Sequence, residues 1–346
     1  MDILLGGRLA AAVLAVGALT AHGAPPALAQ EPEVPAGGRY LEPVFDDVTV
    51  TYDVPFHTVV NSRGETQTLR LDLYEPAGDT AAQRPVVLMM SGGFLNFIYK
   101  SYLFGAGEAY ARAGYVVASI EYRVRPEMDM SGFPEVFDED ELTAASLDAY
   151  DDALAATAWL RDHADEHRLD ARALVAAGGS AGGSIAWHLA WLPGGDVRPG
   201  PPAVAAALPL SAAPLNLAVP TADAPPVLAS HGTDDTVIPY AWATDACARA
   251  VAVGARCDVV AFEGAGHPAV DPSPIVPQHN DEVRRRAFAF IAREVLAPLG
   301  YFGAPDPAPD PVPAPADPAA PAAPGGPALP EAAPAAAVPG RPTYTG

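Results

Sequence analysis

ALVAAGGSAGGSIAWHLAW, residues 173–191, is the stretch of this chain that decides the fold. Its first five residues are all apolar, which predicts a short buried strand over residues 173–177. Glycines and other small residues follow, and the pattern from Ala181 to Trp191 predicts a helix. A buried strand that passes through a tight turn directly into a helix is typical of a parallel sheet covered by helices.

Ser180 lies at the centre of this turn, in the pattern G-x-S-x-G formed by residues 178–182. A strand before it and a helix after it are the context in which a serine becomes an exposed nucleophile at the top of a sheet. Small neighbours allow the strand and the helix to approach, and the helix directs its first amide groups toward the serine. The alternative is that residues 178–182 form only a glycine-rich turn with no catalytic role. Such a turn does not require a strand before it and a helix after it.

The alternation of strands and helices continues on both sides of this stretch. Residues 48–54 and 69–74 alternate in polarity, which predicts the edge strands of an antiparallel hairpin. Further strands are predicted at residues 85–90, 115–122, 204–210, 226–230 and 258–262, and further helices at 101–113, 143–168, 240–253 and 279–296. We therefore expect an α/β fold with a mostly parallel central sheet and helices on both faces.

The two ends of the chain differ from this pattern. Residues 1–29 combine a basic residue, an apolar run and an A-x-A site, which predicts a signal peptide and a secreted or periplasmic protein. The apolar run is too short to span a membrane. We expect a short irregular leader at residues 30–45, one folded domain at 46–300, and a disordered Pro/Ala-rich tail at 301–346.

Charge and cysteine content narrow the range of partners. A formal net charge of -22 argues against a nucleic acid or an anionic membrane as partner, because both would be repelled.

Cys247 and Cys257 flank the end of a predicted helix and can form a disulfide in an oxidising compartment. Two buried free thiols are the alternative. No neighbouring His or Cys completes a metal site around them, so we expect neither a metal nor a cofactor. The oligomeric state stays open.

A serine hydroxyl needs a general base to react at neutral pH. His267 follows the predicted strand at residues 258–262, and α/β sheets gather their functional side chains at such carboxyl ends. Residues 231–239, HGTDDTVIP, form another turn after a strand and supply two candidate acids, Asp234 and Asp235. Physical argument alone leaves the choice between these two neighbours open.

Three segments carry a resemblance to a known family. Residues 178–182 (GGSAG), 231–239 (HGTDDTVIP) and 264–267 (GAGH) resemble, in order and spacing, the α/β-hydrolase esterases. The similarity is greatest to carboxylesterases related to the hormone-sensitive-lipase-like and feruloyl-esterase-like hydrolases, and it covers about residues 48–297. It implies an α/β-hydrolase fold and a serine hydrolase that cleaves carboxylic esters through an acyl-enzyme intermediate.

The resemblance also implies roles for individual residues. Ser180, Asp235 and His267 would form the catalytic triad, since the family's acid occupies the position of Asp235 in the H-G-x-x-D turn. Gly93, Phe94 and Ala181 would provide the amides of the oxyanion hole.

Residues 91–94, SGGF, depart from the family pattern, because Ser91 stands where the family usually has histidine. The donors expected here are backbone groups, so the exchange need not remove them. The departure leaves open whether this loop forms a standard oxyanion hole.

Two segments near the predicted site bear on the substrate. The aromatic residues of positions 94–104 either line an acyl pocket or pack the start of a helix; they are Phe94, Phe97, Tyr99, Tyr102 and Phe104. Residues 126–141 are irregular and acidic, which favours a cap-like loop. The expected substrate is a small-molecule or polymer-derived ester, and the sequence does not specify its acyl or alcohol part.

Two other functions are compatible with the pattern. One is a serine peptidase of the prolyl-oligopeptidase type, although the short stretch between Gln30 and Val48 cannot build the β-propeller that those enzymes usually carry. The other is a non-catalytic binding protein on a hydrolase scaffold, for which a degraded triad would be expected.

Overall fold

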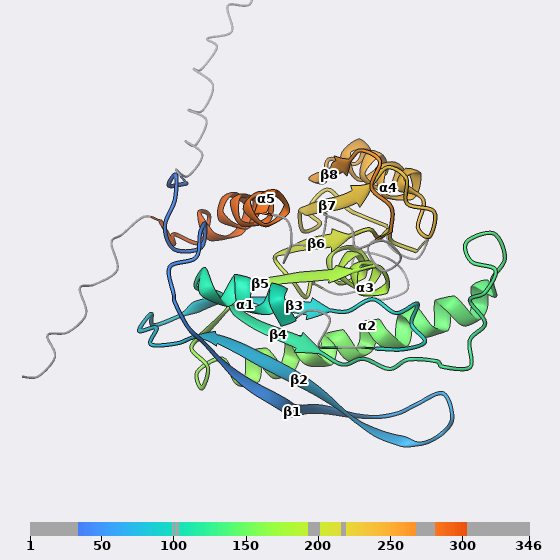
Figure 1. Ribbon diagram of the computed structural model, residues 1–346, viewed down its shortest axis with the longest axis horizontal. Helices are drawn as coiled ribbons and strands as arrows, with labels where there is room; N and C mark the ends of the chain where they lie inside the picture. Colours follow the sequence, from blue (N-terminus) through green and yellow to red (C-terminus); the bar gives the residue numbers. More distant parts are fainter. Residues whose placement is uncertain are drawn as a thin grey trace, which may run out of the picture. The chain divides into compact units, whose positions relative to one another are not determined.

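The computed structural model of the chain describes residues 34–98, 100, 104–192, 201–215, 219–267 and 281–302 (Figure 1). By internal contacts the chain divides into two units, Met1–Asp306 and Pro307–Gly346. The second unit, the predicted signal peptide and most of the predicted tail lie outside the described residues.

A single sheet of eight strands forms the centre of the described unit, in the order β1-β2-β4-β3-β5-β6-β7-β8. The strands are β1 (Val48–Val60), β2 (Thr66–Pro76), β3 (Arg84–Met90), β4 (Val116–Ile120), β5 (Leu169–Gly179), β6 (Ala206–Leu210), β7 (Val227–Gly232) and β8 (Cys257–Phe262). β2 pairs antiparallel with both β1 and β4, and every other pairing is parallel. The prediction of a mostly parallel α/β sheet is confirmed.

Helices cover both faces of this sheet (Figure 1). They are α1 (Phe104–Arg112), α2 (Glu139–Asp162), α3 (Ala181–Trp191), α4 (Tyr240–Ala252) and α5 (Asp281–Ile291), the last continuing into a π-helical turn at Ala292–Leu296. α2, α3 and α4 pack on one face, and α1 and α5 pack on the other. Strand side chains alternate between these layers, as in β3, where Leu88 faces the first and Met89 the second.

One strand prediction is wrong in detail. We expected both strands of the initial hairpin at the sheet edge, but only β1 lies there. β2 bonds to β4 on its other side, and its residues Leu71 and Leu73 are completely buried in the core. The apolar residues of β2 are therefore explained by its position inside the sheet, where they are buried.

The predicted helix at residues 143–168 begins and ends earlier than expected, because α2 spans Glu139–Asp162. Asp138 caps its first turn by accepting hydrogen bonds from the amides of Asp140 and Glu141, each at 3.0 Å. Acidic residues are favourable here because the amino end of a helix carries a partial positive charge. The acidic run 138–141 thus serves to start the helix.

The packed chain extends beyond residues 46–300 at both ends. Tyr40, within the predicted leader, is buried and contacts the rings of Tyr115 and Tyr301 with centroids 5.4 Å apart in each case. The Tyr301 hydroxyl also donates to Asp170 Oδ2 at 3.1 Å. These contacts close the face of the sheet that α1 and α5 cover.

Cys247 of α4 and Cys257 at the start of β8 form the predicted disulfide. The bridge joins a surface helix to the outermost strand of the sheet. It constrains the turn between them, and this favours the folded state by restricting the unfolded chain.

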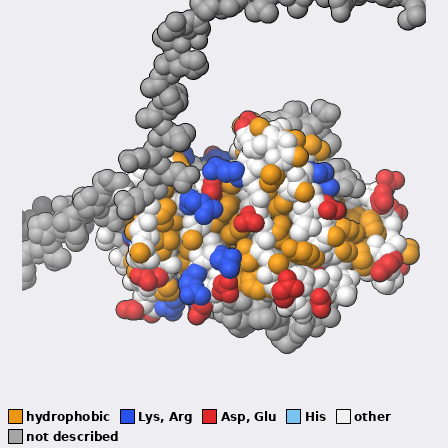
Figure 2. All heavy atoms as spheres, turned by 90° about the horizontal axis from the view of Figure 1, so that it is seen from above, with side chains coloured by type: hydrophobic (Ala, Val, Ile, Leu, Met, Phe, Trp, Pro, Cys, Tyr) orange, Lys and Arg blue, Asp and Glu red, His pale blue; other side chains and the backbone are white. Residues whose placement is uncertain are grey.

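On the face drawn in Figure 2, apolar and acidic side chains are interspersed over much of the surface, while Lys and Arg gather toward one side. The net negative charge is therefore unevenly distributed on this face. Over the described ranges, no helix combines the length and apolarity needed to cross a bilayer.

Candidate active site

Ser180 occupies the turn between β5 and α3 and has an unusual backbone conformation, with φ 53° and ψ -124°. Residues with a side chain rarely adopt a positive φ, so the surrounding structure must impose it. The Ser180 amide donates to the Leu210 carbonyl at the end of β6, at 2.9 Å. This bond fixes the turn on the neighbouring strand, and it leaves the serine side chain at the carboxyl end of the sheet.

Two glycines make this turn possible. A Cβ atom on Gly182 would lie 2.1 Å from the Met90 carbonyl oxygen, and one on Gly178 would lie 2.4 Å from the Gly182 oxygen. Both distances are far below van der Waals contact. The start of α3 can therefore press against the end of β3 only because these positions have no side chain.

A continuous hydrogen-bonded chain links three of the predicted site residues. His267 Nε2 lies 3.0 Å from Ser180 Oγ, and His267 Nδ1 lies 2.8 Å from Asp235 Oδ2. Because an ionised carboxylate only accepts hydrogen bonds, Nδ1 carries the proton and Nε2 is left to accept from the serine hydroxyl. All three side chains are at least nine-tenths buried. The structure thus brings Ser180, Asp235 and His267 together.

Asp235 is held in its ionised form. Its Oδ1 accepts hydrogen bonds from the amides of Val237 and Ile238, at 2.9 and 2.8 Å. Burial alone would raise the pKa of Asp235, but contacts with His231 and His267 and the Ile238 amide outweigh it and hold this pKa well below its usual range. A charged Asp235 favours the protonated imidazole of His267 when a proton reaches it.

His231 is a second buried histidine on Asp235. Its Nε2 lies 2.9 Å from the Ile238 carbonyl oxygen and 3.4 Å from Asp235 Oδ2. The buried His231 side chain therefore connects the start of the turn of residues 231–239 to its end. Asp234, the other candidate acid, is exposed, and its Oδ1 accepts a hydrogen bond from the Thr233 hydroxyl at 3.4 Å.

The loop after β3 lies directly beside Ser180. A Cβ on Gly92 would lie 3.0 Å from Ser180 Cβ, and one on Gly93 would lie 2.1 Å from the Phe97 carbonyl oxygen. Gly93, at φ 138°, and Phe94, at φ 53°, both have left-handed backbones. The loop that contains Gly93 and Phe94 thus lies against Ser180 at Gly92, and the amides of Gly93, Phe94 and Ala181 as oxyanion donors remain a prediction.

Two contacts from the chain after β4 hold this loop. The Tyr122 hydroxyl donates to the Ser91 carbonyl at 2.6 Å, and the Arg125 amide donates to the Leu95 carbonyl at 2.8 Å. Burial raises the pKa of Tyr122 well above its usual value, so this phenol stays a donor. The loop is anchored through its backbone, and this does not require the histidine that the family has at the position of Ser91.

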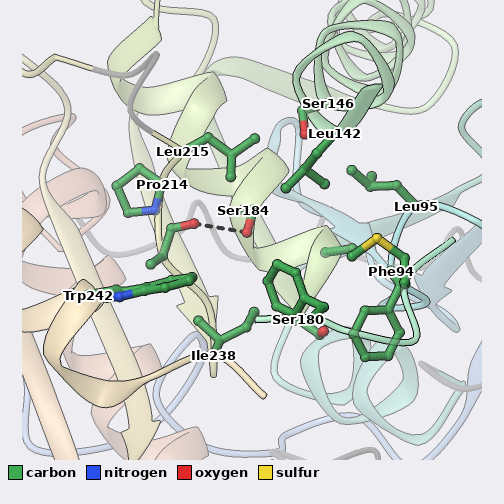
Figure 3. Close-up of a pocket in the computed structure, with 14 residues that line it drawn as sticks. Phe94, Leu95, Leu142, Ser146, Ser180, Ser184, Pro214, Leu215, Ile238 and Trp242 are labelled. Carbon is green, nitrogen blue, oxygen red and sulfur yellow. Dashed lines mark hydrogen bonds between the residues drawn. The ribbon is translucent and has the colours of Figure 1, made fainter. Parts of the chain in front are cut away.

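Ser180 opens into a pocket with an empty volume of about 520 Å³, part of which is open to solvent (Figure 3). Its walls come from the loop after β3, the chain before α2, α2 itself, α3, the chain after β6 and the start of α4. The lining residues are Phe94, Leu95, Met130, Phe133, Leu142, Ser146, Ser180, Ala181, Ser184, Ala213, Pro214, Leu215, Ile238 and Trp242. Most of them are apolar, which suits an apolar substrate group.

A buried histidine, His188, supports the wall of the pocket that contains Leu215. The Leu215 amide donates to His188 Nε2 at 3.3 Å. Burial lowers the pKa of His188 to about 4, so its imidazole is neutral and able to accept this bond.

The segments proposed to shape the pocket have mixed outcomes. In the predicted cap-like loop, Met130 and Phe133 line the pocket, and Phe133 meets the ring of Trp242 edge-on at 6.3 Å. Of the clustered aromatic residues, Phe94 lines the pocket, whereas Phe97 is 46% exposed and does not. Tyr99, Tyr102 and the Phe104 side chain lie outside the described residues.

Metal binding has no candidate centre in the part of the chain that the structure describes, where no three His, Cys, Asp or Glu side chains gather to hold an ion. The polar groups around Ser180 instead pair with one another. The arrangement is suited to proton transfer within a hydrogen-bonded chain.

A serine at a strand-to-helix turn, followed along the chain by an aspartate and a histidine after later strands, defines the α/β-hydrolase class. Residues 71–196 match the family model BD-FAE. This stretch is therefore similar to an esterase-like family, and the chain has the α/β-hydrolase fold that its motifs suggested.

Solved structures with the same fold include Thermogutta terrifontis esterase 2. Its form phosphonylated by cyclosarin is 22% identical, with a TM-score of 0.55, and the match covers 75% of this chain and 97% of that one. Its form phosphorylated by paraoxon is 23% identical, with a TM-score of 0.54 and the same coverage. The butyrate-bound form of the enzyme is 21% identical, with a TM-score of 0.52, covering 73% of this chain and 97% of that one.

Several residues that contact or line the site were not found from the sequence. Two of them, Tyr122 and Arg125, lie in the chain after β4 and hold the loop beside Ser180. The other two line the pocket: Ser146 lies on α2 and Trp242 on α4. No local motif marks them, because each takes part through a contact with residues far away in the sequence. His231 is the exception, since its place in the turn at 231–239 already linked it to the acid.

We expect Gly182→Ala to destabilise the fold by about 2 to 3 kcal/mol, because the added methyl overlaps the Met90 carbonyl oxygen. Gly179→Ala is the matched control, since a Cβ there meets only Leu210 Cδ2 at 4.0 Å. Urea unfolding of the two variants measures the difference. Equal midpoints for both variants would show that the close approach of α3 to β3 does not constrain the fold.

Proposed function

We propose that this protein is a secreted serine hydrolase that cleaves carboxylic esters through Ser180, Asp235 and His267. The observation that carries the proposal is the buried chain of hydrogen bonds from Asp235 through His267 to Ser180, which ends at a mostly apolar pocket. Each of the three groups has the partner that its role requires. The proposed substrate is a small-molecule or polymer-derived ester.

In the first half of the reaction, Ser180 Oγ attacks the ester carbonyl and transfers its proton to His267 Nε2. Asp235 stabilises the imidazolium that forms. The carbonyl oxygen becomes an oxyanion, for which the amides of Ala181 and of the Gly93–Phe94 loop are the proposed donors. Collapse of this intermediate breaks the ester bond, and the leaving alcohol takes the proton from His267.

In the second half, a water molecule gives a proton to His267 and attacks the acyl-enzyme. The second tetrahedral intermediate collapses, releases the acid and returns the proton to Ser180 Oγ. The acyl group remains in the pocket during this step. Since the pocket is lined mainly by apolar side chains, we propose that it selects the acyl part of the ester.

The similar structures support this chemistry. Thermogutta terrifontis esterase 2 is described as phosphonylated by cyclosarin, phosphorylated by paraoxon and bound to butyrate. An esterase that reacts with organophosphorus compounds and binds a short carboxylate is the behaviour expected of an activated serine next to an acyl pocket.

Secretion is part of the proposal. It rests on the signal-peptide pattern of residues 1–29 and on the disulfide between Cys247 and Cys257, a bond that persists in oxidising compartments.

Treatment of the full chain with paraoxon should add one diethylphosphoryl group, at Ser180, and intact-mass and peptide analysis should detect it. Ser180→Ala should take no label and should lose hydrolysis of 4-nitrophenyl butyrate by on the order of 10⁵- to 10⁶-fold. Ser184→Ala is the control, because the Ser184 hydroxyl already bonds to the Ala213 carbonyl at 2.9 Å and should not be needed for labelling. Turnover by Ser180→Ala at the wild-type rate would refute the mechanism.

Asp235→Asn should lower kcat by about 10³- to 10⁴-fold, because the neutral side chain no longer stabilises the imidazolium of His267. Asp234→Asn should change kcat less than about threefold, since Asp234 is exposed. The charge of Asp235 also stabilises the fold above the ordinary aspartate pKa, and this contribution is lost as the pH falls toward its lowered pKa. Equal losses of kcat in both variants would show that Asp235 has no special role.

Protein exported by an expressing bacterium should begin at Gln30 and contain no free thiol. N-terminal sequencing and thiol titration measure both properties. Recovery of the chain only from the cytoplasm with an intact Met1 would contradict the proposed secretion.

A further inference from the structure

The pocket beside Ser180 contains a hydroxyl group that the proposed reaction does not use. Ser146, on α2, lines the pocket and is 2% exposed. Its Oγ has no hydrogen-bond partner among the described residues. A buried hydroxyl normally finds a partner, because losing its bonds to water without replacement is costly.

A serine inside a helix usually bonds to the carbonyl oxygen four residues earlier or points to solvent. Ser146 does neither, although the corresponding carbonyl belongs to Leu142 on the same helix. Its hydroxyl therefore has no partner among the described residues, and a polar group that reached it from the pocket would supply one.

The other serines of the pocket are already engaged. Ser180 Oγ bonds to His267, and Ser184 Oγ donates to the Ala213 carbonyl, drawn as the dashed line in Figure 3. The remaining lining residues are apolar or aromatic. Among the described lining residues, Ser146 thus offers the one buried, unpaired polar group in an otherwise apolar wall.

The position of Ser146 suggests which part of a substrate it meets. Figure 3 shows Ser146 and Ser180 well apart, with Leu142 and Ser184 drawn between them. His267, which must protonate the leaving alcohol, is not among the residues that line the pocket. The alcohol therefore lies beside His267, and the acyl group extends from Ser180 toward Ser146.

We propose that Ser146 is a specificity-determining residue that donates a hydrogen bond to an oxygen at the far end of the acyl group. The preferred substrates are then esters of acids that carry an ether, hydroxyl or carbonyl oxygen remote from the scissile carbonyl. This inference rests on the proposed function and specifies its substrate class. A purely apolar acyl chain of the same length leaves the Ser146 hydroxyl unpaired and is discriminated against.

The test uses 4-nitrophenyl esters in matched pairs. Each pair consists of an ω-methoxyalkanoyl ester and an alkanoyl ester with the same number of heavy atoms. The pairs cover acyl lengths from pentanoyl to decanoyl. The ratio of kcat/KM within a pair should peak at one acyl length in the wild type, where the ether oxygen reaches Ser146. A ratio that does not vary with length would overturn the proposal.

Ser146→Ala should lower the peak ratio by about threefold to tenfold, the discrimination expected from one neutral hydrogen bond. The change of this ratio between wild type and Ser146→Ala cancels the intrinsic difference in solvation between the two esters, as in a double-mutant cycle. Ser146→Thr keeps the hydroxyl and should keep the peak.

Ser119→Ala is the matched control, because Ser119 Oγ on β4 is also buried and has no partner within the described ranges, but does not line the pocket. A change of the ratio in Ser119→Ala as large as in Ser146→Ala would overturn the assignment. If the wild type hydrolyses both esters and Ser146→Ala leaves every ratio unchanged, this inference fails while the proposed function stands. If the wild type hydrolyses neither ester and Ser180 takes no paraoxon label, the proposed function fails, and this inference fails with it.

Discussion

The contact between the start of α3 and the end of β3 is the constraint on which the rest of the site depends. Gly182 and Gly178 let the two backbones approach to distances that no side chain would allow. The strained conformation of Ser180 follows, because the chain must reverse from β5 into α3 within this small space. The same approach brings the loop after β3 against Ser180. The positions of the proposed nucleophile and of the proposed oxyanion loop therefore both depend on this contact between α3 and β3.

The site is assembled along the carboxyl edge of the sheet, where β3, β5, β7 and β8 each contribute a loop. This arrangement allows a charged aspartate to be buried. Asp235 receives two backbone amides and one histidine, which replace the water it loses. The cost of burying its charge is offset by donors that the fold has already placed, so the proposed charging of His267 during the reaction needs little reorganisation.

The pocket is built by other segments than those that carry the proposed catalytic groups. Its walls include the chain before α2, α2 itself and the start of α4, all on the face of the sheet that also holds α3. These parts are tied to the site by side chains such as Phe133 and Trp242, which meet edge-on. Substrate selection can therefore change with these segments while the hydrogen-bonded chain at Ser180 stays the same.

The sequence by itself determined the strand–turn–helix around Ser180, the parallel sheet and the order of serine, acid and histidine, because each rests on local patterns of apolar residues and glycines. It missed the start of α2 at Glu139, although Asp138 is a recognisable cap, since residues 126–141 were assigned to a cap-like loop. The resemblance had already favoured Asp235 over Asp234, but only tertiary structure supplied the physical reason, which is the burial of Asp235. Only tertiary structure also held the loop at Ser91 through Tyr122 and placed Ser146 in the pocket. These features depend on contacts between segments far apart in the chain, which no local pattern encodes.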